Sequence, residues 1–327
     1  MKKLLMSIVA LLATVSIYAE DTYVVTVNYN GTSASVSIPS AITSYVSCPS
    51  GSSSHVKLVQ TSTATKNPGE IIYQLSGTSD DGEFYMEGEF KATIQLNDLT
   101  LTNPDSTAIH IKNGKRIKVS LANGTVNTLA DGTKNADSKG CFHCKGHTEF
   151  QGKGTLNIKS NFYHAIYSKE YIEVKNCTIN VTGAKKDGIH CQQYFLMRSG
   201  TISITSPEDD GIQVELKGDT STGKTSDHED EDSGNFYMTS GKLSITGHGG
   251  VCIKTDGVIK YDGGEQIFNT NDVIENAGTS AIISAKTDEE GTETIYDLNG
   301  RQVPEGSLRK GVYIVRRGNK VSKRLVK

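Results

Sequence analysis

The 327-residue chain contains no tryptophan and only six prolines, and its formal net charge is only −3. So small a charge gives no reason to expect a nucleic-acid partner, since phosphate binding needs a basic surface. After residue 19 the chain has no run of 18 apolar residues, so we expect no membrane insertion. No stretch of its central repeats shows the 3.6-residue period of a helix.

The one long apolar stretch is at the N-terminus. Residues 1–19 read "MKKLLMSIVALLATVSIYA", with two lysines, an apolar run and a small residue, Ala19, at the end. This pattern is typical of a secretory signal peptide rather than a membrane span. No cysteine follows directly, which argues against a lipid anchor. We therefore predict a secreted protein.

What the chain does contain is a repeat. The segments "GKGTLNIK" (152–159), "KNCTINVT" (175–182) and "RSGTISIT" (198–205) recur at a step of 23 residues. A fourth copy, "TSGKLSIT" (239–246), follows after an 18-residue insertion within 217–235. The aligned residues of the four copies are Thr155, Thr178, Thr201 and Lys242. Ten residues after each of them stands a small residue followed by isoleucine. The small residues are Ala165, Gly188, Gly211 and Cys252.

Each repeat alternates apolar and polar residues, which is the period of a strand with one buried face. Apolar columns run through Leu156, Ile179, Ile202 and Leu243, and through Ile158, Val181, Ile204 and Ile245. A unit of 23 residues is too short for a helix pair and suits one coil of a parallel β-helix, with two or three short strands. We therefore predict an all-β solenoid in which identical positions stack about 4.8 Å apart.

The predicted organisation has four parts. Residues 1–19 form the signal peptide, and the Ser/Thr/Val-rich residues 20–66 form an N-terminal β cap or small β module. Residues 67–275 form the solenoid, whose first coils are irregular, as terminal repeats usually are. Residues 286–327 change in composition and predict two or three antiparallel strands.

The six cysteines have two interpretations. Cys141 and Cys252 occupy the small-residue column, which indicates small buried apolar residues. Cys144 and Cys191 share a column two coils apart, about 9–10 Å, which is too far for a disulfide. The alternative is a CxxC metal or redox site in "CFHCKGH" (141–147).

Acidic residues precede two of the column glycines. Asp187 and Asp210 fall in one column on adjacent coils, Asp209 precedes Asp210, and Asp256 in "KTDG" is a fourth candidate. Carboxylates about 5 Å apart repel each other, so one takes up a proton or a cation lies between them. Three interpretations stay open: solvated turn residues, a structural or ligand-bridging Ca²⁺ site, or a catalytic carboxylate pair.

A polar and aromatic stripe follows the apolar column. It comprises His110, His143, Tyr167, His190, Gln213 and Lys254, with Lys145 and Lys169 two residues farther on in adjacent coils. We predict that His143, Tyr167, His190, Gln213, Lys145 and Lys169 bind a linear polymer, with rings for sugar faces and cations for acidic groups. An ordinary solvated ladder is the alternative. The acidic insertion 227–232 is read as a disordered loop or a weak divalent-cation site.

Several motifs in order carry a resemblance. "GEIIYQLSGTSDDGEF", "AIHIKNGKRIKVSLANGTVNTLADGT", "AIYSKEYIEV", "KDGIH", "GTISIT", "EDDGIQVE" and "CIKTDG" span roughly residues 68–265. They resemble a bacterial carbohydrate-binding domain family with a pectate-lyase-like, right-handed parallel β-helix. The resemblance implies non-catalytic binding of plant cell-wall polysaccharides, such as polygalacturonate and cellulose, with calcium.

The tail carries a second resemblance. "IYDLNGRQV" and "GVYIV…KRLVK" resemble the C-terminal sorting signals of type IX secretion in Bacteroidota, although the leading strand motif is absent. This implies a contact with secretion machinery and delivery to the cell surface or outside. A periplasmic location is expected if the tail is not a functional signal.

Two alternatives to a binding protein remain, an enzyme that degrades pectin and a structural protein. Polygalacturonases share the β-helix, and "KDG", "EDD" and "GHG" occur here in their order, which would make Asp187, Asp209, Asp210 and His248 catalytic. The asparagine-threonine lead and the arginine-isoleucine-lysine motif are missing. A lyase would need a base, usually arginine, yet only Arg116 and Arg198 lie between residues 100 and 285, and no carboxylate partner is evident for Arg198. A surface structural or adhesive protein is the third possibility.

Overall fold

The computed structural model describes residues 23–61, 69–133, 138–218, 231–268, 275–276, 294–298, 300–317 and 320–326. The predicted signal peptide and most of the acidic insertion lie outside the described residues. In the described ranges strands dominate, and the two helical turns are η1 (Ser40–Ile42) and η2 (Glu305–Ser307). Among the described residues, no helix has the length and apolar character needed to cross a membrane.

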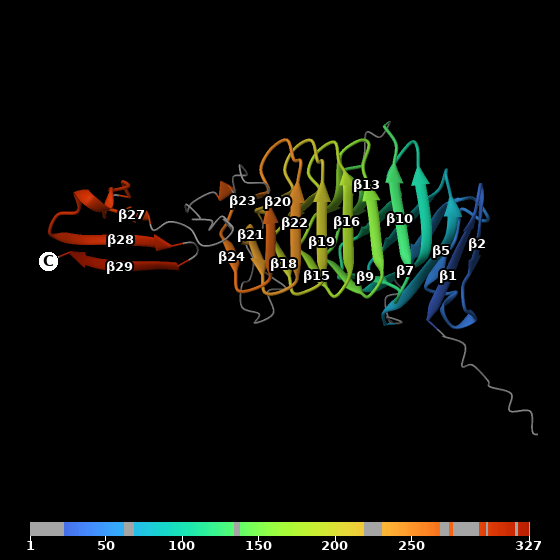
Figure 1. Cartoon of the computed structure of the whole chain (residues 1–327). Helices are drawn as coiled ribbons and strands as arrows, with labels where there is room; N and C mark the ends of the chain where they lie inside the picture. The colour runs from blue at the N-terminus through green and yellow to red at the C-terminus, as the bar shows by residue number, and fades with distance from the viewer. Residues whose placement is uncertain are drawn as a thin grey trace, which may run out of the picture.

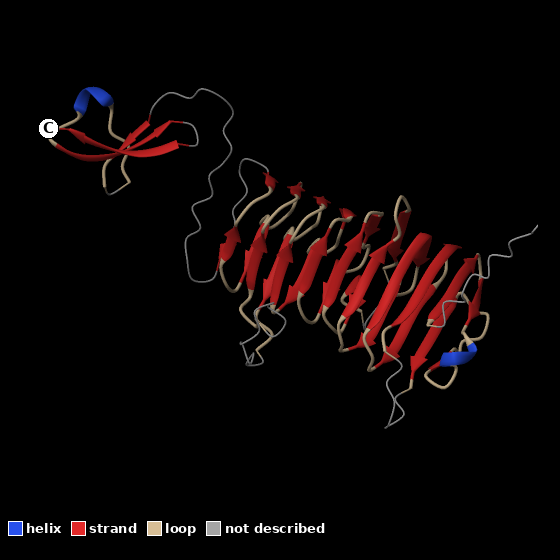
Figure 2. Cartoon of the chain, turned by 90° about the horizontal axis from the view of Figure 1, so that it is seen from below, coloured by secondary structure: helices blue, strands red, loops and turns tan. Residues whose placement is uncertain are grey.

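The chain winds as a parallel β-helix whose coil has three strands, each on its own face (Figures 1 and 2). Face 1 contains β9 (Ile117–Leu121), β12 (Thr148–Gly152), β15 (Ile172–Lys175), β18 (Tyr194–Met197), β21 (Asn235–Met238) and β24 (Ile259–Tyr261). Face 2 contains β10 (Val126–Asp131), β13 (Thr155–Lys159), β16 (Thr178–Gly183), β19 (Thr201–Thr205), β22 (Lys242–Thr246) and β25 (Glu265–Phe268).

Face 3 is the longest stack. It contains β3 (Val46–Ser47), β4 (His55–Gln60), β6 (Glu83–Gly88), β8 (Ile109–Asn113), β11 (Gly140–Cys144), β14 (His164–Ser168), β17 (Ile189–Gln192), β20 (Ile212–Glu215), β23 (Ile253–Thr255) and β26 (Glu275–Asn276). Faces 1 and 2 join at the N-terminal end, because the long strands β5 (Ile71–Ser79) and β7 (Ala92–Asn103) run through both. The first half of β7 pairs with β9 and its second half with β10.

The predicted register is confirmed. Leu156 pairs with Ile179, which pairs with Ile202, and Ile202 pairs with Leu243. On face 3 the isoleucines that follow the small-residue column are likewise partners, from Ile166 to Ile253. These columns are fully or almost fully buried and form one continuous core through the described part of the solenoid. A single coil could not bury this apolar stripe alone, so the stack itself stabilises the fold.

The N-terminal segment is built onto the same core. Strand β1 (Val24–Asn30) pairs in parallel with β5, and β4 pairs in parallel with β6. Only β2 (Ser33–Ser37) and β3 pair antiparallel, with β1 and β4 respectively. The segment expected as a cap or separate module therefore contributes strands to the stack, and its antiparallel strands lie at the end.

The C-terminal segment forms a small antiparallel sheet of β27 (Thr294–Tyr296), β28 (Gly311–Arg317) and β29 (Lys320–Val326). This matches the two or three antiparallel strands expected there.

All six cysteines are free. Five are buried and only Cys48 is partly exposed, as expected for small apolar core residues. Cys141 and Cys144 both point into the core, so "CFHCKGH" does not present its two thiols to a surface metal site.

Candidate functional site

The candidate site lies where the chain enters the strands of face 3. The residue before the small-residue column is His164 on one coil, Asp187 on the next and Asp210 on the one after. The backbone stacks these positions, because Ala165 N–H donates to Asp187 O and Gly188 N–H donates to Asp210 O. Glycine at 188 is required sterically, since a Cβ there would lie 2.5 Å from a methyl carbon of Ile204.

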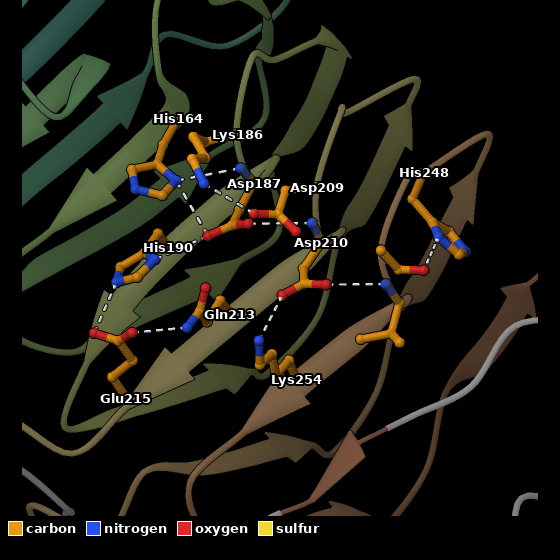
Figure 3. Close-up of polar contacts among 12 residues, drawn as sticks. His164, Lys186, Asp187, His190, Asp209, Asp210, Gln213, Glu215, His248 and Lys254 are labelled. Carbon is orange, nitrogen blue, oxygen red and sulfur yellow. Dashed lines mark hydrogen bonds and ion pairs between the residues drawn. The ribbon is translucent and has the colours of Figure 1, made fainter.

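Asp187 is the centre of the cluster and is only 1% exposed (Figure 3). Its Oδ2 atom lies 3.1 Å from His164 Nδ1 and 2.9 Å from His190 Nδ1. Its Oδ1 atom accepts the backbone N–H of Asp210 at 3.1 Å. The far side of the His190 ring lies 3.3 Å from Glu215, so an acidic group faces each of its nitrogens.

The electrostatics follow from this burial. Desolvation alone would raise the pKa of Asp187, but contacts with His164 and His190 outweigh it and hold that pKa well below its usual range. Burial would lower the pKa of His190, yet Asp187 and Glu215 raise it above its ordinary value. For His164 burial prevails, and its pKa is lowered. The cluster therefore keeps Asp187 ionised.

Asp210 and Asp209 continue the cluster on the next coil. Asp210 Oδ1 accepts the backbone N–H of Val251 at 2.9 Å, and its Oδ2 lies 3.7 Å from Lys254 Nζ. Burial, with repulsion from Asp187, raises the pKa of Asp210. Asp209 is half-buried and pairs with Lys186 at 3.2 Å. Ligand atoms of the three carboxylates lie within 4.8 Å of one another, so the structure brings them together.

Two residues lie apart from this group. Asp256 follows strand β23, whereas Asp187 and Asp210 precede their strands. Asp256 therefore lies at the C-terminal ends of the face 3 strands, where its carboxylate accepts the N–H of Leu216 at 2.8 Å. The expected fourth metal ligand is therefore not with the other three. His248 points away from Asp187 in Figure 3, and its Nδ1 lies 2.9 Å from the carbonyl oxygen of Gly250.

The polar stripe forms a continuous column on face 3, as the register pairs His110, His143, Tyr167, His190, Gln213 and Lys254 in turn. The rings pack on one another: His110 and His143 are stacked with centroids 4.6 Å apart, His143 and Tyr167 meet edge to face, and Tyr167 and His190 are tilted with centroids 5.3 Å apart. Tyr167 is 3% exposed and His190 7%. Contacts among the rings therefore bury ring surface that was expected to contact sugars.

The two lysines predicted to bind the polymer lie at the surface, unlike the rings of the stripe. Lys145 and Lys169 are exposed, and Lys145 lines a shallow groove with Lys112, Lys115, Glu87 and other polar residues.

The expectation that Arg198 lacks a carboxylate partner is wrong. Its Nε and Nη2 atoms donate to Glu173 at 2.9 and 3.0 Å. Glu173 lies in β15, and Arg198 directly follows β18, which pairs with β15 on face 1. The two residues are 25 positions apart in the sequence, so the stacking of the coils brings them together.

Face 2 carries an outward surface that the site prediction did not include. Across five strands its central row contains only small neutral side chains: Thr128, Asn157, Asn180, Ser203 and Ser244. The Asn180 amide donates to Asn157 at 2.9 Å, which fixes both side chains. The row is half-exposed, and the five strands lie side by side in Figure 1. In the sequence, this row could have been found from the polar residues that lie between the two apolar columns of each repeat.

Comparison with known proteins agrees with this fold. The chain belongs to the carbohydrate-binding domain-containing protein family, whose model matches residues 58–306. A relative of that description from Acetivibrio thermocellus is 27% identical over 119 residues, which cover 34% of this chain and 42% of the relative. The chain thus spans less than half of that relative's length.

A solved structure also matches. It is described as the polysaccharide lyase-like protein from C. thermocellum, in a gadolinium derivative, and superposes with a TM-score of 0.53 at 19% identity. The match covers 78% of this chain and 97% of that chain. At this identity the likeness concerns the fold alone.

Proposed function

We propose that this protein is a secreted, non-catalytic carbohydrate-binding protein that recognises plant cell-wall polysaccharide of the pectin or cellulose type. The observation that carries the proposal is the neutral row on face 2, in a chain of a carbohydrate-binding family. Short hydroxyl and amide side chains about 4.8 Å apart can hydrogen-bond to a hydroxyl-rich polymer lying across the strands.

The setting of the acidic cluster supports binding rather than hydrolysis. A glycosidase needs an acid and a base carboxylate that both reach the scissile bond. Asp187 is almost fully buried, and both of its oxygens are engaged by protein groups. The two arginines between residues 100 and 285, the remaining lyase candidates, lie near carboxylates on face 1, Arg116 at 3.7 Å from Glu149 and Arg198 at 2.9 Å from Glu173.

Calcium is part of the proposal as a bridging ion. Ca²⁺ takes six to eight oxygen ligands. Asp187 has both oxygens engaged, so a bridging ion would bind Asp209 and Asp210 and replace their contacts with Lys186 and Lys254. The two carboxylates supply too few ligands for a closed site, and uronate carboxylates of an acidic glycan with water would complete the coordination. Calcium removal should therefore weaken binding to polygalacturonate and spare binding to cellulose.

Affinity electrophoresis through gels containing polygalacturonate, cellulose derivative or xylan tests the proposal, with and without EDTA. Retardation by at least one of these glycans is expected. No release of reducing ends and no unsaturated product should accompany it. Migration unchanged by every glycan would refute the binding function, and product release abolished by Asp210→Asn would establish the enzyme instead.

A matched pair of variants tests the surface. Ser203→Glu places a longer charged side chain in the neutral row, between Asn180 and Ser244. Ser120→Glu makes the same change on face 1, also between neutral polar neighbours and equally half-exposed. We expect at least tenfold weaker glycan binding for the first, about 1.4 kcal/mol, and little change for the second. Equal effects would exclude face 2 as the contact surface.

Export completes the proposal. The N-terminal 19 residues and the C-terminal tail support delivery through a secretion pathway to the cell surface or exterior, and fractionation of cells carrying the full chain or one ending at residue 285 tests it. Retention of the shortened chain in the periplasm is the expected result.

A further inference from the structure

We propose that His164, Asp187 and His190 form a binding site for a divalent transition ion such as Zn²⁺, separate from the calcium oxygens of Asp209 and Asp210. All three side chains are buried, and their donor atoms lie within 4.8 Å of one another. The inference concerns the cation chemistry of face 3 and does not require the glycan function.

The geometry is close to that of a zinc ligand set. Ligands about 2.0–2.1 Å from a tetrahedral zinc ion lie roughly 3.4 Å from each other. The Oδ2 atom of Asp187 lies 3.1 Å from His164 Nδ1 and 2.9 Å from His190 Nδ1. The two histidine nitrogens lie within 4.8 Å of each other, so small adjustments of the three side chains would place an ion among their ligand atoms, and water would take the fourth position.

Hydrogen bonding at His164 points to a cation. The backbone N–H of Asp187 donates to His164 Nδ1 at 3.2 Å, so in this tautomer Nδ1 carries its electron pair, and a bound metal ion would replace this long hydrogen bond. The same nitrogen faces the Asp187 carboxylate, which is also an acceptor when ionised. Two acceptors at 3.1 Å repel each other unless a proton or a metal ion lies between them.

His190 repeats the pattern. Glu215 lies 3.3 Å from its Nε2 atom and accepts hydrogen bonds only, so the proton of the neutral ring belongs on Nε2. Nδ1 then presents its electron pair to Asp187 at 2.9 Å. A proton on His190 would satisfy this one contact, and the contact at His164 would need a second proton on a nitrogen that the Asp187 N–H already faces. A metal ion satisfies both.

The surroundings of His190 are those of a metal ligand. Histidine ligands usually donate their second N–H to a carboxylate, which fixes the tautomer and the ring orientation. Glu215 fills that role, and it is held in turn by the Gln213 amide at 2.7 Å. Two imidazole nitrogens and one carboxylate favour zinc, nickel, copper or cobalt over calcium, which prefers oxygen alone.

The test uses untagged full-length protein stripped with a chelator and titrated with Co²⁺ or Zn²⁺. We expect one Co²⁺ per chain with the visible absorption of a low-coordinate site, displaced by Zn²⁺ and unaffected by excess Ca²⁺. His164→Gln and His190→Gln should each weaken binding at least 100-fold. Glu215→Gln, which alters only the support of His190, should weaken it 10- to 100-fold.

His248→Gln and Asp256→Asn are the matched controls, because they remove a histidine and a carboxylate that lie apart from the three-residue set. Both should bind Co²⁺ like the parent protein. X-ray absorption of the zinc complex should show two imidazole ligands, a readout that does not depend on how well a variant folds. Failure of the parent protein to bind Co²⁺ or Zn²⁺, equal loss in His248→Gln, or displacement by Ca²⁺ would each overturn the proposal.

Discussion

Gly211→Ala tests the close approach of neighbouring coils. A Cβ at this position would lie 2.5 Å from the carbonyl oxygen of Cys252 and 2.5 Å from a methyl carbon of Ile245. That carbonyl cannot move freely, because it accepts the N–H of Ile212 at 2.9 Å. Overpacking costs about 1–3 kcal/mol and a lost hydrogen bond about 1 kcal/mol. The lower entropy of the unfolded alanine chain offsets about 0.4–1 kcal/mol.

The expected net loss is about 2 kcal/mol of unfolding free energy. With a urea dependence of about 2 kcal/mol per molar, the midpoint should fall by roughly 1 M in urea unfolding followed by circular dichroism. Gly114→Ala is the control, since the nearest atom to its added Cβ is Lys145 Cε at 4.0 Å. The control should change stability by no more than about 0.5 kcal/mol. Equal midpoints for the two variants would refute the reasoning.

Two further predictions concern ionisable core groups. Burial raises the pKa of Asp131 to about 6 against the hydrogen bonds from Ser160 and Asn161, whereas the unfolded value is about 3.9. Its stabilising contribution is complete below about pH 4 and is lost as pH rises to about 6, by up to about 3 kcal/mol. Asp131→Asn should remove that slope from the stability-pH curve, and parallel curves for variant and parent would contradict the assignment. Under native conditions a thiol reagent should modify Cys48 alone, and all six cysteines in denaturant; a native count of two or more would contradict the burial.

The stacking of the central coils could be predicted because each coil repeats the same residue types. Leu156, Ile179 and Ile202 identify themselves as one column through a constant step along the chain. The N-terminal strands offered no such step. β1 pairs with β5 across a segment that contains β2, β3 and β4 and lacks the 23-residue repeat, so its parallel pairing is visible only in three dimensions.

The candidate site could be predicted in part. The column arithmetic placed Asp187 beside Asp210, and it would also have placed His164 one step before Asp187, since each precedes a small residue and isoleucine. Asp256 was misplaced because "TDG" resembles "KDG", although it follows its strand whereas Asp187 precedes one. A local motif does not state which end of a strand it occupies.

The burial of His110, Tyr167 and His190 could not be predicted from the sequence, for a different reason. The columns identify which rings are neighbours, but not whether they lean on one another or stand apart. Tyr167 lies between His143 and His190, with Lys139 Nζ 5.2 Å from its ring centroid, so its surroundings depend on rotamers and on a residue outside the stripe. The exposure of the central row on face 2 is easier to predict, because threonine, serine and asparagine side chains are too short to cover one another.

The head of the face 3 strands shows how a β-helix can change chemistry without changing its backbone. The column contains Gly140, His164, Asp187, Asp210 and Val251 on successive coils. The backbone hydrogen bonds continue through all of these coils, because each carbonyl accepts from the coil before it whatever side chain it carries. Side chains at this column therefore vary at little cost to the fold, whereas Gly188 and Gly211, one residue later, cannot accept even a methyl group without displacing a neighbour. Metal ligands and residues that pack the coils together thus occupy adjacent positions. Substitution of His164 can therefore report on metal binding, while Gly211→Ala reports on the packing of the coils.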